Sequence, residues 1–294
     1  MSEQSPSASP PVTVLGAGLL GAAMAARLGE RGHDVRLWNR SAERAEDAAR
    51  EAGGVRAVGD LAGAVRGAGV VLTVLRDGDA VADVAERFLP HLDEDAVWVQ
   101  ASTVGPAAAN RLRAQADAAG RAFLDAPVSG STEPARKGAL TWLVAGDAGV
   151  LDRARPVLED LGQRIQHLGR RSEGSALKLV VNAWMTAATA AMADALALAE
   201  QLGTDPADLR DVLDGGPLGM PYALGKAAMM TSGDYPAGFP AELALKDLDL
   251  AASDGPDPLP DALQRVRERL RGAAPAGRGR EDVAVLAELP PPGA

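Results

Sequence analysis

A lysine stands at the start of the most apolar run in the sequence. The run begins GSALKLVVN at Gly174 and continues AWMTAATAAMADALALAE, with nothing to break a helix before Gly203. Apolar and small side chains on every side indicate a buried helix. A buried ammonium is costly unless it is paired or used in chemistry. Lys178 is therefore a candidate for proton exchange, the alternative being a structural ion pair with Asp125 or Asp247.

The spacing around this lysine favours a chemical role. Gly174, Lys178 and Asn182 lie four residues apart, so they share one face of the expected helix. We expect Gly174 to leave room for a ligand, and Asn182 to hold either the lysine amine or a substrate oxygen. Burial lowers the pKa of a lysine amine towards the range in which proton transfer is efficient at neutral pH.

Lysine usage adds an independent indication. The only lysines are Lys137, Lys178, Lys226 and Lys246, and apart from the histidines every other basic side chain is arginine. Arginine cannot replace an amine that must gain and lose a proton. A lysine in a chain that otherwise uses arginine for positive charge is therefore consistent with proton exchange at Lys178.

A second signature is the glycine pattern GAGLLG, which directly follows an apolar, strand-like segment and precedes a helical one. In this context the pattern G-x-G-x-x-G predicts a dinucleotide-binding turn. Its glycines permit a tight turn and close approach to a pyrophosphate, and the helix N-terminus offers free N–H groups. The candidate contacts are Gly16, Gly18, Leu19, Leu20 and Gly21. The alternative is a glycine-rich turn in an unrelated α/β protein.

The second apolar segment ends in WNRS, where an NAD site usually carries Asp or Glu to bind the ribose hydroxyls. Here Asn39, Arg40 and Ser41 can instead bind a 2′-phosphate, Arg40 through its charge. We therefore predict NADP(H) in preference to NAD(H). The alternative is that Arg40 is merely exposed and that Ser41 only caps a helix. Leu75 and Arg76 end another strand, where further cofactor contacts are expected.

The first half of the chain alternates short apolar runs with amphipathic stretches. The runs predict strands at Val12–Leu15, Asp34–Trp38, Val70–Leu75 and Ala96–Gln100, and two more in AFLDAPV and LTWLVAGD. Continuous apolar strands that alternate with helices indicate a parallel sheet covered on both faces. The fold class expected here is an α/β dinucleotide-binding domain of the Rossmann type.

The strand signal stops at about Arg170. The long helix follows, and then helical segments that are interrupted at GGPLGMP, SGDYPAGFP and DGPDPLP. An all-α domain built on a long buried helix is therefore expected. We assign a disordered leader to residues 1–11, an NADP-binding Rossmann domain to 12–169, and an all-helical substrate and dimerisation domain to 170–289.

Composition limits the classes of partner. The chain has 294 residues, 47% of them hydrophobic, and a formal net charge of -10, which argues against nucleic acid and anionic membranes as partners. It has no cysteine, and its three histidines lack metal-like spacing, so no metal site is expected. The apolar helix is rich in alanine and threonine, contains Asp194 and lacks basic flanks, which favours a soluble core helix over a membrane span. The N-terminus lacks the features of a signal peptide, and we expect a cytoplasmic protein.

Five motifs together resemble the β-hydroxyacid dehydrogenases, a family that includes 3-hydroxyisobutyrate dehydrogenases and glyoxylate/succinic semialdehyde reductases. They are the glycine pattern, ASTVGP (Ala101–Pro106), DAPVSGS (Asp125–Ser131), GSALKLVVN and LKDLDLA (Leu245–Ala251), in this order. The resemblance extends from about Val12 to Val285. Ser131, the second serine of VSGS, and the Phe239–Pro240 pair look more like the glyoxylate/succinic semialdehyde reductase branch.

This resemblance implies roles for particular residues. Lys178 would be the catalytic acid/base, which protonates the carbonyl oxygen as hydride leaves the nicotinamide, with Asn182 beside it. The residues that would bind an anionic small-molecule substrate are Ser129, Gly130, Ser131, Thr103 and Phe239. Thr103 would also lie beside the nicotinamide, and Lys246 and Asp247 would contact the cofactor. The alternative for DAPVSGS is an ordinary β-turn. Ser172 and Ala139 depart from common family residues, which leaves the substrate open.

Two other functions remain open. Imine reductases have a similar architecture and a similar WNR signature, although they typically lack the lysine and the DAPVSG loop. A non-catalytic dinucleotide-binding scaffold is the second alternative, and such proteins lose the lysine. The alanine-rich helix also predicts a homodimer or a larger homo-oligomer, because small side chains suit close packing between helices.

Overall fold

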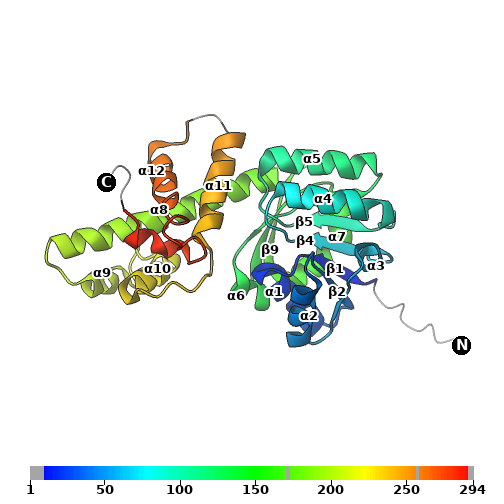
Figure 1. The fold of residues 1–294 in the computed structure, drawn as a ribbon, viewed down its shortest axis with the longest axis horizontal. Coiled ribbons are helices and arrows are strands. Elements are labelled where there is room, and N and C mark those ends of the chain that lie inside the picture. The colour runs from blue at the N-terminus through cyan, green and yellow to red at the C-terminus, as the bar shows by residue number, and fades with distance from the viewer. Residues whose placement is uncertain (1–9, 170–172, 256–257, 291–294) are drawn as a thin grey trace, which may run out of the picture. The chain divides into compact units, whose positions relative to one another are not determined.

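Figure 1 shows the computed structural model, which describes residues 10–169, 173–255 and 258–290. The described residues form two compact units that divide between Lys178 and Leu179. The leader expected at residues 1–11 lies almost entirely outside the described residues, as does Ser172. The boundary predicted between residues 169 and 170 falls at the edge of an undescribed stretch.

The first unit contains one sheet of nine strands in the order β3-β2-β1-β4-β5-β6-β8-β7, with β9 also paired to β8. The strands are β1 (Val12–Leu15), β2 (Val35–Trp38), β3 (Val55–Ala57), β4 (Val70–Thr73), β5 (Val97–Gln100), β6 (Ala122–Asp125), β7 (Val128–Ser129), β8 (Leu140–Ala145) and β9 (Gly162–Gly169). The predicted strands are all present, although AFLDAPV forms two short strands rather than one.

The expected parallel sheet is present, and antiparallel pairs extend it at one side. Strands β1 to β6 pair in parallel, whereas β8 is antiparallel to both β6 and β7. The connection from β6 to β8, residues 126–139, contains β7 and a five-residue helix at Thr132–Arg136. The strand order reverses between β1 and β4, which is where ligands bind in open α/β sheets.

Helices cover both faces of the sheet, as expected. They are α1 (Leu19–Glu30), α2 (Ala42–Glu51), α3 (Leu61–Val65), α4 (Gly78–Phe88), α5 (Gly105–Ala118), α6 (Thr132–Arg136) and α7 (Ala148–Leu161). One core lies between the sheet and α1, α2 and α7, and a second lies between the sheet and α3, α4 and α5. In the second core, Trp98 packs edge-on against Phe88 and Phe123.

The second unit is helical, as predicted. The long helix α8 (Glu173–Gln201) runs into it and is followed by α9 (Pro206–Leu213), α10 (Pro221–Ser232), α11 (Ala241–Asp254), α12 (Asp261–Leu270) and the short 3-10 segment η2 (Val283–Glu288). The breaks between them match the predicted interruptions. Proline begins α9 and α10, and Gly233 ends α10 with a φ of +68°.

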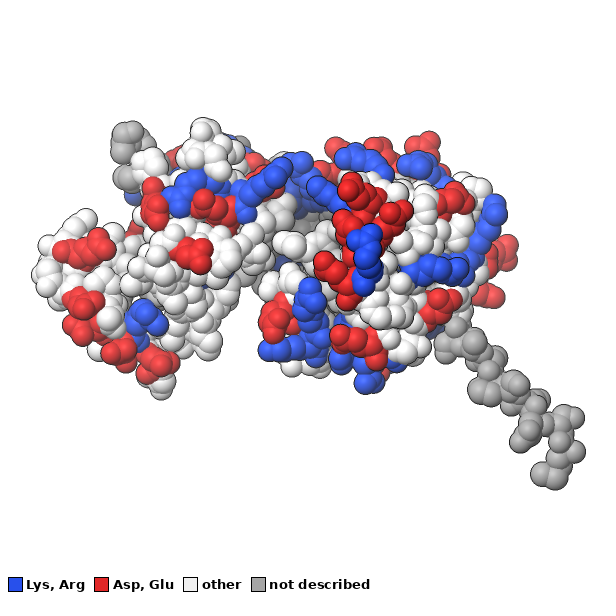
Figure 2. Space-filling model, turned by 60° about the horizontal axis from the view of Figure 1, so that its bottom comes forward, with Lys and Arg blue, Asp and Glu red and all other residues white. Residues whose placement is uncertain are grey.

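Helix α8 is buried along one side only. Leu179, Ala190 and Leu196 belong to its buried side, whereas Val180 and Trp184 are exposed. Among the described helices, α8 is the one long and apolar enough to span a membrane. Its buried residues pack against α10 and α11 in two small cores, which is how a core helix is built. Over the face drawn in Figure 2, acidic and basic side chains are interspersed.

Candidate active site

The glycine turn lies between β1 and α1, and its three glycines serve different purposes. Gly16 has a φ of +124°, and a Cβ there would lie 2.1 Å from the carbonyl oxygen of Val74. A Cβ on Gly21 would lie 2.0 Å from the carbonyl oxygen of Gly16. These two glycines therefore permit the turn to pack closely.

Gly18, in contrast, has nothing within 4 Å of a Cβ built on it. It is also the N-cap of α1 and makes no side-chain capping bond. The start of α1 thus combines open space with N–H groups that no side chain caps. This arrangement fits the pyrophosphate of a dinucleotide, which such a helix terminus can bind through its N–H groups and its dipole.

The three polar residues after β2 differ in their surroundings. The side chain of Asn39 accepts a hydrogen bond from the backbone N–H of Ala17 at 3.2 Å and donates one to the carbonyl of Ser41 at 3.0 Å. Asn39 therefore joins the second strand end to the glycine turn. Ser41 is the N-cap of α2 but its hydroxyl makes no capping bond. Arg40 is exposed and forms no ion pair with the residues that the structure describes.

A serine that the sequence analysis did not single out organises the ends of β4 and β5. The hydroxyl of Ser102 accepts a hydrogen bond from the N–H of Leu75 at 2.8 Å and donates one to the carbonyl of Thr73 at 3.1 Å. The side chain of Gln100 bonds to both the N–H and the carbonyl of Ser102. This buried network fixes Leu75 beside the segment that leads to Thr103. Arg76 is exposed and lies 3.9 Å from Asp77.

The loop after β7 has the geometry of a turn that only glycine favours. Gly130 has a φ of +127°, and a Cβ there would lie 2.8 Å from the Leu140 side chain. Ser129 ends β7, where it pairs with Thr141. Ser131 is exposed at the N-cap position of α6 and its hydroxyl makes no capping bond. The loop thus presents hydroxyl groups at an exposed bend.

The helix that carries Lys178 is fastened to the end of β6. Both oxygens of the Asp125 carboxylate accept hydrogen bonds from Ser175, one from its N–H at 2.8 Å and one from its hydroxyl at 2.6 Å. Asp125 is fully buried. Lys178 follows Ser175 by about one helical turn, and it is half-buried rather than buried. We call this contact the Asp125–Ser175 clasp.

Gly174 has a different role from the one expected. A Cβ at this position would lie 2.4 Å from the carbonyl oxygen of Leu143 and 2.7 Å from that of Asp125. The glycine therefore lets the start of α8 pack directly on the backbone of β6 and β8. The expectation that it leaves room for a ligand was wrong, because this space is filled by main chain.

Burial changes the titration of Asp125. Removal from water raises the pKa of this carboxyl group to about 6, although the two bonds from Ser175 and the charge of Arg113 act in the opposite direction. The carboxyl group therefore titrates between mildly acidic and neutral pH.

In the second unit, Asn182 contacts Asp247 of α11. The Asn182 amide donates to one carboxylate oxygen of Asp247 at 2.5 Å, and the ammonium of Lys246 forms an ion pair with the other oxygen at 2.9 Å. Asn182 and Asp247 are both buried. Among the described residues, nothing donates a hydrogen bond to the Oδ1 atom of Asn182. This oxygen can therefore accept a bond from a protonated group.

The structure thus gathers the predicted residues in two sets. In the first unit, the predicted residues lie at or beyond the carboxyl ends of the parallel strands. They are the glycine turn, the WNRS segment, Leu75, the segment leading to Thr103, and the loop of Ser129, Gly130 and Ser131. The second unit brings together Asn182, Lys246 and Asp247, with Phe239 half-buried just ahead of α11. Within the described ranges, no three His, Asp or Glu side chains are placed to hold a metal ion. The residues missed by sequence reasoning are Ser102 and Ser175, whose partners are distant in the chain.

Known proteins resemble both units. Residues 11–169 match the family described as the NAD binding domain of 6-phosphogluconate dehydrogenase. Residues 172–289 match the family described as NAD-binding of NADP-dependent 3-hydroxyisobutyrate dehydrogenase. Glyoxylate/succinic semialdehyde reductase 1 of Arabidopsis thaliana is 30% identical over 247 residues, which make up 83% of this chain and 85% of the reductase.

Solved structures extend the similarity. Mycobacterium tuberculosis 3-hydroxyisobutyrate dehydrogenase, solved with L-serine, has a TM-score of 0.84 and 29% identity, with 95% of this chain and 98% of that chain covered. A reductive aminase from Aspergillus terreus in complex with NADPH and ethyl levulinate has a TM-score of 0.63 and 22% identity, with 95% and 99% covered. At that identity, the reductive aminase shows a shared fold only.

The raised pKa of Asp125 predicts a pH-dependent stability. Its folded value of about 6 exceeds the ordinary value near 4, so the folded chain holds this proton more tightly than the unfolded chain does. The stabilisation of the folded chain by this proton is fully present below about pH 4 and is lost as the pH rises through 6. From pH 4 to pH 7 the native protein should lose this stabilisation, whereas the Asp125→Asn variant has none to lose. We therefore expect the unfolding free energy of the variant, relative to that of the native protein, to rise by up to roughly 3 kcal/mol over this range.

Chemical denaturation at a series of pH values measures this difference directly. The matched control is Asp60→Asn, which alters an exposed N-cap carboxylate of α3. A difference between native and Asp125→Asn proteins that stays constant from pH 4 to pH 7 would contradict the assigned titration.

Proposed function

We propose that this chain, which belongs to the β-hydroxyacid dehydrogenase family of NAD(P)-dependent oxidoreductases, reduces small carboxyl-bearing aldehydes or keto acids with NADPH. The products would be β- or γ-hydroxyacids, and the reaction would be reversible. The observation that supports this most directly is the array along α8. Lys178 lies one turn beyond the clasped Ser175 and one turn before Asn182.

The proposed mechanism assigns proton transfer to Lys178. Bound NADPH would supply hydride to the carbonyl carbon. Lys178 donates its proton to the carbonyl oxygen as negative charge develops there, and acts as the base in the reverse direction. Asn182, held by Asp247, presents its unpartnered oxygen one turn further along α8 and is suited to orient a protonated group. Gly16 to Gly21 would hold the pyrophosphate.

Substrate recognition would depend on local groups. The chain carries a net charge of -10, so its overall charge does not attract an anion. Ser129, Gly130 and Ser131 offer hydroxyl and backbone N–H donors, the groups that can bind a carboxylate without a cationic side chain. Thr103 and Phe239 complete the proposed set of substrate contacts, and the all-helical part at 170–289 would be the substrate and dimerisation domain.

Imine reduction is the alternative activity. It receives support from the fold shared with the Aspergillus terreus reductive aminase. Lys178 and the DAPVSGS loop favour the carbonyl reaction, because an ammonium that donates a proton to oxygen suits an aldehyde and the loop suits a carboxylate.

Because the chain has no cysteine, nothing in it depends on an oxidising compartment, and we propose that it acts in the cytoplasm.

The reductase activity is tested with NADPH and a substrate panel. The panel contains glyoxylate, succinic semialdehyde, methylmalonate semialdehyde, tartronate semialdehyde and a cyclic imine, and oxidation of NADPH is followed by absorbance. We expect turnover of at least one carboxyl-bearing aldehyde. Lys178→Ala should lower kcat by a factor of about 100 or more, the usual contribution of a general acid.

Two further variants make this test specific. Lys178→Arg keeps the positive charge but cannot release a proton, so it should be nearly as slow as Lys178→Ala. Lys137→Ala removes an exposed lysine at the C-cap of α6 and should retain native kcat. Turnover of the imine only, or native kcat in Lys178→Ala, would refute the proposed reaction.

The preference for NADPH rests on Arg40 and Ser41, whose side chains have no capping or ion-pair partner among the described residues. We expect Arg40→Ala to raise KM for NADPH by about tenfold or more and to leave KM for NADH nearly unchanged, because a charge-assisted bond to the 2′-phosphate is lost. Steady-state kinetics with both cofactors gives the answer. The control is Arg50→Ala, an exposed arginine at the other end of α2. A parallel change for both cofactors would contradict the assignment.

A homodimer or larger assembly would cover the exposed side of α8. Val180, Trp184 and Leu198 lie on this side with exposed fractions of 64%, 59% and 53%. Their spacing of 4 and 14 residues keeps them on one face of a helix. A long apolar stripe of this kind marks a protein interface, and a second copy that offers the same stripe fits a two-fold contact.

Light scattering after size exclusion tests the assembly. The native protein should have a mass that is a multiple of the 30.1 kDa chain. Leu198→Glu should shift it to the monomer, because the interface would bury an unpaired charge. Val212→Glu places the same charge on an exposed apolar residue of α9, away from the stripe, and should leave the mass unchanged. A native monomer would refute the assembly.

A further inference from the structure

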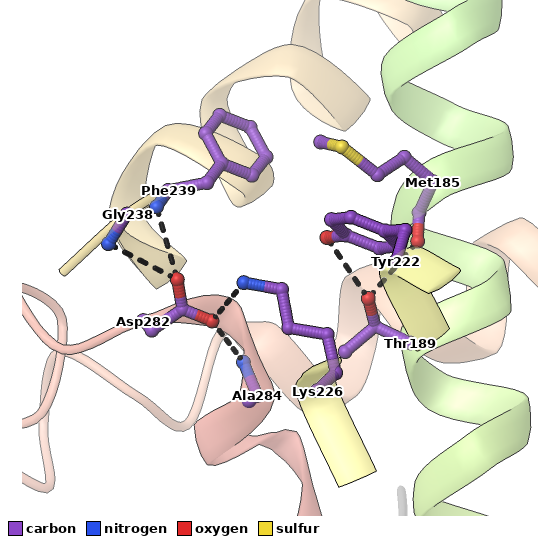
Figure 3. Close-up of polar contacts among 8 residues, drawn as sticks. All are labelled: Met185, Thr189, Tyr222, Lys226, Gly238, Phe239, Asp282 and Ala284. Carbon is purple, nitrogen blue, oxygen red and sulfur yellow. Dashed lines mark hydrogen bonds and ion pairs between the residues drawn. The ribbon is translucent and has the colours of Figure 1, made fainter. Parts of the chain in front are cut away.

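The second unit contains a buried ion pair that the proposed mechanism does not use. The ammonium of Lys226 in α10 lies 2.6 Å from the Oδ1 atom of Asp282, just before η2 (Figure 3). Asp282 is completely buried and Lys226 is 7% exposed. A buried pair of this kind adds little stability compared with apolar side chains of similar size, so its presence points to a role in fixing one conformation.

The Asp282 carboxylate binds three backbone N–H groups besides the ammonium. Its Oδ1 atom also accepts from Ala284 at 3.0 Å. Its Oδ2 atom accepts from Gly238 at 3.2 Å and from Phe239 at 3.0 Å. Figure 3 shows the carboxylate between the loop that contains Phe239 and the side chain of Lys226. One carboxylate therefore holds two consecutive amides of that loop.

Backbone contacts extend this attachment to the start of α11. The N–H of Val283 donates to the carbonyl of Phe239 at 2.9 Å, and the N–H of Ala241 donates to the carbonyl of Glu281 at 2.8 Å. Pro240 and Asp282 form an antiparallel bridge. The segment before η2 thus fixes the main chain on both sides of Phe239, at the point where α11 begins.

The Lys226 ammonium is enclosed on another side by the ring of Tyr222, whose centroid lies 5.1 Å away. The Tyr222 hydroxyl lies 3.2 Å from the hydroxyl of Thr189, which donates to the carbonyl of Met185 in α8. Burial raises the pKa of Tyr222 to about 12, so its hydroxyl remains neutral. The pair therefore lies between α10 and the segment before η2, and Tyr222 connects it to α8.

We propose that Lys226 and Asp282 are positioning residues, which fix the main chain at Gly238 and Phe239 and thereby set how the Phe239 side chain meets the substrate. The proposal rests on the proposed function, in which Phe239 contacts the substrate. Lys226 holds the carboxylate in place, and the carboxylate holds the two amides. Neither residue touches the reacting atoms.

Asp282→Asn tests the proposal in the full-length enzyme. An amide has one accepting oxygen, which cannot serve both the ammonium side and the two loop amides. We expect KM for the aldehyde substrate to rise by about tenfold or more while kcat stays within about threefold, because the proton and hydride donors are unchanged. The dissociation constant for NADPH should change less than KM, since the glycine turn and the WNRS segment, which would bind the phosphates, lie in the first unit.

A rescue variant separates positioning from stability. In Lys226→Met/Asp282→Asn the ammonium no longer competes for the single amide oxygen, which can return to Gly238 and Phe239. We expect KM to return towards the native value. The control is Asp249→Asn, the same substitution in another ion pair of this unit, with Arg267 at 2.6 Å. This control should alter stability at most and leave KM unchanged.

Hydrogen exchange of the Gly238 and Phe239 amides supplies a readout that is independent of activity. Both amides should exchange faster in Asp282→Asn and at near-native rates in the rescue variant and in Asp249→Asn. Native exchange rates or a native KM in Asp282→Asn would overturn the proposal. If the native enzyme turns over no aldehyde, the reductase assignment fails by itself, and exchange rates still decide whether Asp282 holds the loop.

Discussion

The candidate site in the first unit depends on one buried carboxylate. Asp125 ends β6 and holds the first turn of α8 through two bonds to Ser175, and the loop with Ser129 to Ser131 follows it directly. The same residue thus fixes the direction in which the lysine helix leaves the sheet and the origin of the loop. Gly174 lets the helix approach the strands closely enough for the clasp to form. Burial makes the ionised carboxylate costly, and the two bonds offset that cost in part.

The second unit uses the same device twice. Asp247 holds Asn182, and Asp282 holds the loop before α11. A carboxylate suits this task because it accepts several hydrogen bonds and requires none as a donor. Each of these aspartates joins segments that are more than 40 residues apart in the chain. A helical unit that is rich in alanine has few large side chains that could fix such segments by packing. Buried polar contacts hold the segments in one arrangement instead.

The sequence was informative where the signal is local. Strand β1 and the breaks between helices follow from apolar runs, glycine and proline, which act over a few residues. Strand β9 was not predicted, because GQRIQHLG is mostly polar and pairs only with β8. The antiparallel direction of β8 was not predicted either, since an apolar run does not indicate the direction of its partner strand. Ser102 and Ser175 resemble ordinary loop and helix serines until their distant partners are known.

Lysine usage illustrates both the strength and the limit of residue types. The rarity of lysine is consistent with a special role for Lys178, because an arginine in its place could not gain and lose a proton. Lys226 and Lys246 show a second reason for choosing lysine, since both form ion pairs with buried aspartates, at 2.6 and 2.9 Å. A compact ammonium fits beside a buried carboxylate where a planar guanidinium needs more room and more acceptors. Lys226 and Lys246 therefore mark confined places for a positive charge, so the rarity of lysine does not by itself indicate proton exchange at Lys178.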